Sequence, residues 1–141
     1  MSYLVATDGS TESDKAVRYA ARHAVAFDET LEIAHVLTPD SELVDGEIIL
    51  PGEEAAVDAG ESILANAKAV AEAAAGDTPI HVETELLTGR PPDAITDYAT
   101  EANVTAIYVG HRGLSAEHEQ IVGSVAKSIV DKARVPVTVI R

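Results

Sequence analysis

The chain contains no cysteine and no tryptophan, and a single phenylalanine among its 141 residues. Without cysteine it can form neither disulfides nor thiolate metal sites, and it has no cysteine nucleophile. Its 46% of hydrophobic residues consist largely of alanine and valine. We therefore expect a core built from small aliphatic side chains.

Basic residues are also scarce, since 10 Lys and Arg stand against 24 Asp and Glu and give a formal net charge of -14. Such a chain is repelled by the phosphate backbone, so nucleic acid is not expected as a partner. The acidic residues are spread along the sequence, which keeps a protein hydrated and soluble. Together with few lysines and many alanines, this composition indicates a halophilic protein adapted to a very salty cytoplasm.

Long hydrophobic runs are missing as well. No window approaches the roughly 18 apolar residues that span a membrane, and the N-terminus lacks a basic segment followed by an apolar one. We therefore expect a cytoplasmic protein without a membrane partner. The length suits one domain over residues 1–141.

The patterns that are present alternate between strand and helix. Apolar or alternating runs predict strands at 3–7, 30–38, 79–87, 105–109 and 137–140. Helical spacing predicts helices after Ser10 and over 55–75, 91–102 and 124–133. Residues 41–54 show no clear period and are expected to form a mobile loop.

This alternation predicts an α/β fold, in which a parallel sheet is covered by helices on both faces. Ligands of such sheets bind beyond the carboxyl ends of the strands, where the winding reverses. Asp8 follows the first strand and Gly110 ends the fourth, so both are expected at that crevice. Asp8 has an ordinary alternative role, which is to cap the turn that it forms with Gly9 and Ser10.

Three glycines and a serine follow the fourth strand with the spacing G-x2-G-x9-G-S, at Gly110, Gly113, Gly123 and Ser124. Glycine lets a ligand approach the main chain, and the first turn of the helix after Gly123 has N–H groups suited to an anion. Turns and helix starts also use glycine for ordinary reasons. The pattern thus indicates an anion site without requiring one.

That spacing, the opening YLVATDGS and the ending GSVAKSIVDKARVPVTVIR resemble the universal stress protein family over nearly the whole chain. The resemblance implies a doubly wound, Rossmann-like sheet of the adenine nucleotide alpha hydrolase kind, with five parallel strands in the order 3-2-1-4-5. It also implies ATP or AMP as the ligand. The nucleotide-binding residues that it implies are Asp8, Val36, Gly110, Arg112, Gly113, Gly123, Ser124 and Val125.

In this resemblance the glycines and Ser124 hold the ribose and phosphates, and Asp8 and the backbone of Val36 meet the base. Between Gly113 and Gly123 the chain departs from the family, because it carries two glutamates there and no Lys or Arg. Arg112 is the one nearby cation of this segment. Acid near a triphosphate is unfavourable, so Mg²⁺ or Mn²⁺ is expected to bridge the charge.

Three histidines near these motifs have simpler interpretations. We expect His35 to be a hydrogen-bonded histidine at the rim of the core, and His111 and His118 to be solvated loop residues. The spacing of His111 and His118 fits no usual metal site.

No catalytic motif is found, so the expected function is a nucleotide-sensing stress-response module with little or no turnover, at most a slow ATPase. The alternative is a dimeric scaffold of the same fold that binds protein partners and no nucleotide. In either case the resemblance implies a homodimer through the last strand, Val137 to Ile140, whose apolar edge would otherwise invite uncontrolled pairing.

Overall fold

The fold is built on one parallel sheet. The computed structural model describes residues 1–38, 42–44, 47–49, 53–111 and 123–141. The strands of the sheet are β1 (Ser2–Ala6), β2 (Thr30–Leu37), β5 (Val82–Thr88), β6 (Ala106–Gly110) and β7 (Val137–Ile140). The helices of the described residues are α1 (Thr11–Phe27), α2 (Glu53–Ala75), α3 (Pro91–Glu101) and α4 (Ser124–Lys132).

The strand order is β5-β2-β1-β6-β7, and all neighbouring strands in it are parallel. Numbered along the chain, this is the predicted order 3-2-1-4-5, so the predicted fold is confirmed. The winding reverses between β1 and β6. The carboxyl ends of these two strands therefore define the crevice in which such sheets bind ligands.

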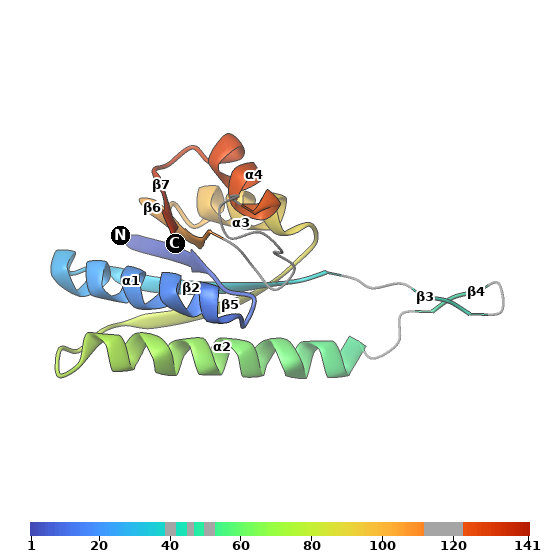
Figure 1. Cartoon of the computed structure of the whole chain (residues 1–141), viewed down its shortest axis with the longest axis horizontal. Coiled ribbons are helices and arrows are strands. Elements are labelled where there is room, and N and C mark those ends of the chain that lie inside the picture. The colour runs from blue at the N-terminus through green and yellow to red at the C-terminus, as the bar shows by residue number, and fades with distance from the viewer. Residues whose placement is uncertain (39–41, 45–46, 50–52, 112–122) are drawn as a thin grey trace.

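The helices form a layer on each face of the sheet (Figure 1). Buried residues of α1 and α2 pack on one face, around Val5, Leu31 and Ile33. Residues of α3 and α4 pack on the other face, around Leu4 and Ile107. As the composition predicts, alanine makes up much of this core.

Helix α1 begins as its sequence predicts. The Ser10 side chain caps it by accepting a hydrogen bond of 3.1 Å from the backbone N–H of Ser13. Acidic residues Glu12 and Asp14 lie in the first turn, where the helix dipole favours them. The cap fixes the direction in which the chain leaves β1, and with it the position of Asp8.

Helix α2 lies unusually close to the sheet at Gly60. An added Cβ there would sit 2.8 Å from Cδ1 of Leu86 and 3.3 Å from Cδ2 of His35. Glycine in a helix costs about 1 kcal/mol relative to alanine. Glycine at this position leaves room for the Leu86 and His35 side chains beneath the helix.

The segment expected to be a loop contains two short strands. β3 (Glu42–Val44) and β4 (Glu47–Ile49) pair antiparallel, and α2 begins two residues earlier than expected. The expectation of a loop without secondary structure was therefore wrong. Strands of three residues are too short to show a period, although the intervening Asp45-Gly46 is a typical hairpin sequence.

None of the helices in the described part of the chain is both long enough and apolar enough to cross a membrane.

Candidate functional site

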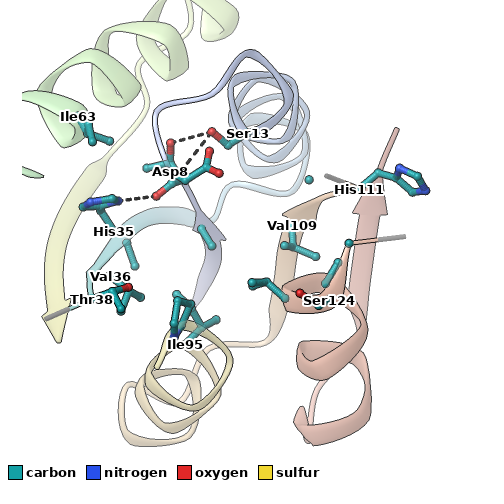
Figure 2. A pocket seen from close by; sticks show the side chains of 18 residues that line it. Asp8, Ser13, His35, Val36, Thr38, Ile63, Ile95, Val109, His111 and Ser124 are labelled. Carbon is teal, nitrogen blue, oxygen red and sulfur yellow. Dashed lines mark hydrogen bonds between the residues drawn. The ribbon is translucent and has the colours of Figure 1, made fainter. Parts of the chain in front are cut away.

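A cavity of about 520 Å³ opens at the carboxyl edge of the sheet. Its walls come from the ends of β1, β2 and β6 and from the first turn of α4 (Figure 2). Six of the predicted site residues line it: Asp8, Val36, Gly110, Gly123, Ser124 and Val125. The structure thus brings together residues from both ends of the chain, while Arg112 and Gly113 lie outside the described residues and stay predictions.

The start of α4 forms one wall of the cavity. Gly123 is the N-cap residue and makes no side-chain cap hydrogen bond to the helix. Its own N–H donates to the carbonyl of His111 at 2.8 Å, and its carbonyl accepts from Lys127 at 3.0 Å. Ser124, Val125 and Ala126, the first residues of the helix, line the cavity. The positive end of the α4 dipole therefore faces this space.

The opposite wall carries Asp8, which follows β1. Its Oδ1 accepts a hydrogen bond of 3.0 Å from the backbone N–H of Ser10. Next to it, the hydroxyls of Thr7 and Ser13 lie 3.1 Å apart, and the Asp8 N–H donates to Ser13 Oγ at 3.4 Å. Asp8 therefore both caps the turn and lines the cavity, so its two predicted roles are compatible.

The backbone after Asp8 turns sharply beneath α2. Gly9 has a φ of 82°, and an added Cβ would lie 3.2 Å from Cγ1 of Ile63. This left-handed conformation favours glycine. The turn keeps Asp8 at the end of β1 and leaves Ile63 on the cavity wall.

His35 holds the ends of β1 and β2 together. Its Nδ1 lies 2.8 Å from the carbonyl oxygen of Thr7. A carbonyl can only accept, so Nδ1 carries the proton and donates it. This contact supports the predicted hydrogen-bonded rim histidine and places the ring against the cavity wall, beside Asp8 (Figure 2).

His111 differs from its expectation. It is 3% exposed and therefore is not a solvated loop residue. Its N–H donates to the carbonyl of Ile140 at 2.7 Å, so its backbone continues the pairing of β6 with β7. Its ring points away from Asp8 and Ser124 (Figure 2). The expectation failed because the strand pairing continues past the predicted end at Val109, through Gly110 to His111. His118 lies outside the described residues.

Apolar residues complete the cavity and were missed by the sequence analysis as site residues. Ile63 of α2 and Ile95 of α3 line it, together with Pro91 and Thr38. Ile63 and Ile95 lie in the helices predicted at 55–75 and 91–102, but a helical period cannot separate a core contact from a cavity wall. Only the tertiary arrangement shows the difference.

An ion pair joins the two helices on this side of the sheet. The Lys132 ammonium of α4 donates a hydrogen bond to the Asp93 carboxylate of α3. This hydrogen bond lowers the pKa of Asp93, and the charges of Lys132 and Arg90 add to the effect. Both groups are exposed, so the pair orients α3 and α4 without adding much stability.

No group of three or more metal-ligating side chains occurs within residues 1–38, 53–111 and 123–141 or the two short strands. What the site offers is a helix N-terminus, a carboxylate, strand-end backbone groups and apolar walls. This combination suits a ligand with one anionic end and one flat, partly apolar end.

A sequence profile of the universal stress protein family matches residues 2–141. The chain belongs to the universal stress protein family. The family predicted from the sequence motifs is therefore confirmed.

Named relatives show the same relationship. This universal stress protein is 32% identical to universal stress protein YxiE of Bacillus subtilis over 151 residues, covering 98% of this chain and 97% of that protein. It is also 32% identical over 142 residues to universal stress protein Rv2005c of Mycobacterium tuberculosis, covering 97% of this chain and 46% of Rv2005c. The chain thus spans about half the length of that relative.

Two solved structures of the family contain nucleotides. A universal stress protein in complex with cAMP superposes with a TM-score of 0.72 at 28% identity, over 100% of this chain and 96% of that one. A universal stress protein from Archaeoglobus fulgidus in complex with dAMP gives a TM-score of 0.75 at 27% identity, over 100% and 98%. Those proteins bind adenine nucleotides on the same fold.

Proposed function

We propose that this universal stress protein binds an adenine nucleotide, ATP or AMP, and acts as a nucleotide-sensing stress-response module with little or no turnover. One observation carries the proposal: the start of α4, which has no side-chain cap, faces a cavity of about 520 Å³ that also holds Asp8. The related proteins in complex with cAMP and dAMP support the choice of an adenine nucleotide.

In the proposed complex the phosphates lie at the start of α4. The N–H groups of the first turn and the Ser124 hydroxyl would donate hydrogen bonds to the phosphate oxygens. The base would lie across the cavity, between Ile63 and Ile95, where the backbone of Val36 and the Asp8 carboxylate can read its polar edge. Gly110 and Gly113 would leave room for the ribose, and Arg112 would add one positive charge.

Electrostatic repulsion opposes the binding of ATP more than that of AMP. The chain carries a formal net charge of -14, and Asp8 itself lies on the cavity wall. A divalent cation, Mg²⁺ or Mn²⁺, would enter with ATP and offset part of this repulsion. AMP has fewer charges and depends less on the cation.

The proposal includes a homodimer formed through β7. This strand is an edge of the sheet, and the carbonyls of Pro136 and Ile140 accept hydrogen bonds from the backbone N–H groups of Ile107 and His111. Strand pairing repeats every two residues, so the N–H groups of Val137 and Val139 point outward, toward a second strand.

The exposed hydrophobic side chains of the described residues support the same edge. Apart from Met1, they lie on α1 and α4: Tyr19, Phe27, Val125 and Val130. These two helices are the ones that contact β7 from the two faces of the sheet. A partner at β7 would lie beside α4, on which Val130 is 50% exposed. The proposal also takes residues 1–141 as one domain that acts in the cytoplasm.

Isothermal titration calorimetry in high KCl tests the nucleotide site. ATP with Mg²⁺, and AMP alone, should each bind the wild-type protein. A Ser124→Asp substitution should weaken binding at least about tenfold, that is by ~1.4 kcal/mol, because it puts a carboxylate beside the phosphates. Asn66→Asp adds the same charge on an exposed position of α2 and should leave binding unchanged.

A silent titration of the wild-type protein would favour the alternative function, a dimeric scaffold without nucleotide. Equal binding by the wild type and Ser124→Asp would show that the ligand does not bind at the start of α4. If phosphate release is detected and persists in Ser124→Asp, the cavity is not the source of that hydrolysis.

A further inference from the structure

Aromatic side chains gather in one place in this protein. The chain has four tyrosines, one phenylalanine and no tryptophan. All but Tyr98 belong to one connected set of ring contacts around His23 and Tyr108, where α1 packs on β1 and β6. We refer to this group as the aromatic cluster, and its members are Tyr3, Tyr19, His23, Phe27 and Tyr108.

Tyr108 and His23 form the polar centre of the cluster. The Tyr108 hydroxyl lies 2.8 Å from Nδ1 of His23. Tyr108 is 4% exposed, and burial raises its pKa to about 12, so the phenol keeps its proton. If the phenol donates, its hydrogen and the Nδ1 lone pair are both satisfied, which is the arrangement expected of a buried tyrosine. His23 then carries its ring proton on Nε2.

The rings of the cluster connect this pair with the surface. The His23 ring lies 5.4 Å from that of Tyr108 and 4.4 Å from that of Tyr19, measured between ring centres. Tyr19 is 41% exposed. Tyr3 also contacts the Tyr108 ring, with ring centres 5.6 Å apart. A buried phenol with a base at hydrogen-bond distance is thus linked by two ring contacts, through His23, to the exposed ring of Tyr19.

We propose that Tyr108 and His23 form a one-electron redox site, with Tyr19 as the ring that exchanges electrons with solution. A dissolved one-electron oxidant removes one electron from Tyr108. The phenolic O–H bond breaks, the proton forms a new N–H bond at Nδ1 of His23, and Tyr108 becomes a neutral phenoxyl radical beside an imidazolium. A one-electron reductant reverses each step.

The composition leaves few competing sites for this chemistry. Cysteine, the side chain most readily oxidised after thiolate formation, is missing from the chain, as is tryptophan, and Met1 is the one methionine. Tyr98 is the one tyrosine outside the cluster. It donates a hydrogen bond to Glu32, but it has no aromatic ring contact with other described residues. Tyr98 therefore serves as an internal comparison.

Flash photolysis tests the site, with photogenerated tris(bipyridine)ruthenium(III) as the oxidant and electron paramagnetic resonance to detect phenoxyl radical. We expect Tyr108→Phe, which keeps the ring, to lose most of the radical signal. Tyr98→Phe should keep it. If Tyr108→Phe leaves the signal unchanged, oxidation occurs elsewhere and the proposal is overturned.

A second variant separates proton transfer from a merely structural hydrogen bond. His23→Asn keeps an acceptor near the Nδ1 position but removes the base. Radical formation should slow several-fold, and its rate should no longer differ between ordinary and deuterated water. Unchanged rates and isotope effects in a folded His23→Asn protein, as judged by circular dichroism, would show that His23 takes no proton. These measurements need no nucleotide, so their outcome is independent of the function proposed above.

Discussion

At the scale of single residues, Gly60 determines how α2 sits on the sheet. His35, whose ring lies near Gly60, holds the carbonyl of Thr7 beside Asp8. The absence of a side chain at one helical position therefore affects a cavity wall through His35. This connection links the packing of a helix with the geometry of the proposed ligand site.

Gly60→Ala should destabilise the protein even though alanine favours helices. The gain in helix propensity is about 1 kcal/mol, whereas overpacking a filled interface costs about 1–3 kcal/mol. The new Cβ would lie 2.8 Å from Cδ1 of Leu86, so side chains of the sheet must move. We expect a lower free energy of unfolding in urea and weaker nucleotide binding.

Ser62→Ala is the matched control for Gly60→Ala, because Ser62 is exposed on the same helix. Its effect on stability should stay within about 0.5 kcal/mol. A Gly60→Ala protein more stable than the wild type would show that α2 has room to shift and that Gly60 does not fix its distance from the sheet.

At the scale of elements, β7 combines a core role with an open edge. One side of the strand pairs with β6, and the N–H groups of Val137 and Val139 face outward by the alternation of the strand. Substitutions at neighbouring positions of β7 should therefore affect different contacts. This property allows dimer formation to be tested without unfolding the sheet.

Val139→Pro should convert the proposed dimer into a folded monomer. Proline removes the outward N–H and is tolerated on an edge strand when that N–H does not serve the sheet. Light scattering after size exclusion should give half the wild-type mass, with an unchanged far-ultraviolet circular dichroism spectrum. Val139→Ala shortens the side chain but keeps the N–H, so it should remain dimeric.

A Val139→Pro protein that stays dimeric would place the interface elsewhere. A wild-type monomer at all concentrations would exclude the proposed dimer altogether. Thr138→Pro offers a further comparison, because its N–H faces β6 and its loss should disturb the sheet itself.

The elements differ in how far they could be predicted from the sequence. The predicted positions of β1, β2 and α3 and the predicted start of α1 agree with the structure to within about two residues. β3 and β4 were missed because three residues cannot show a period. Local patterns placed Asp8 and Ser124 near the crevice, because both follow or begin an element at the carboxyl edge of the sheet. They gave no sign of the apolar walls at Ile63 and Ile95, which depend on how the helices pack.

At the scale of the whole molecule, charge is the dominant property. A formal net charge of -14 on 141 residues makes the folded chain repel itself. Few of these charges are paired in the described residues, where the ion pairs mostly lie on the surface. Stability should therefore depend on the ions around the protein.

Raising KCl from about 0.1 M to about 1 M should increase the urea midpoint, because the Debye length falls from about 10 Å to about 3 Å. Tetramethylammonium chloride at the same ionic strength is the control that separates screening from a specific effect of K⁺. A midpoint that does not rise with KCl would contradict the halophilic interpretation of the composition.

The position of α4 late in the chain has a consequence for biosynthesis. On a translating ribosome, β1, β2 and β5 emerge long before Ser124, so a nascent chain has the Asp8 wall of the cavity but lacks the helix that forms the opposite wall. If the protein binds nucleotide as proposed, the ligand stabilises only the finished fold, by about 2.7 kcal/mol when its concentration is a hundredfold above Kd. Cellular nucleotide would in this way help to decide how many completed molecules escape proteolysis, without affecting those still being made.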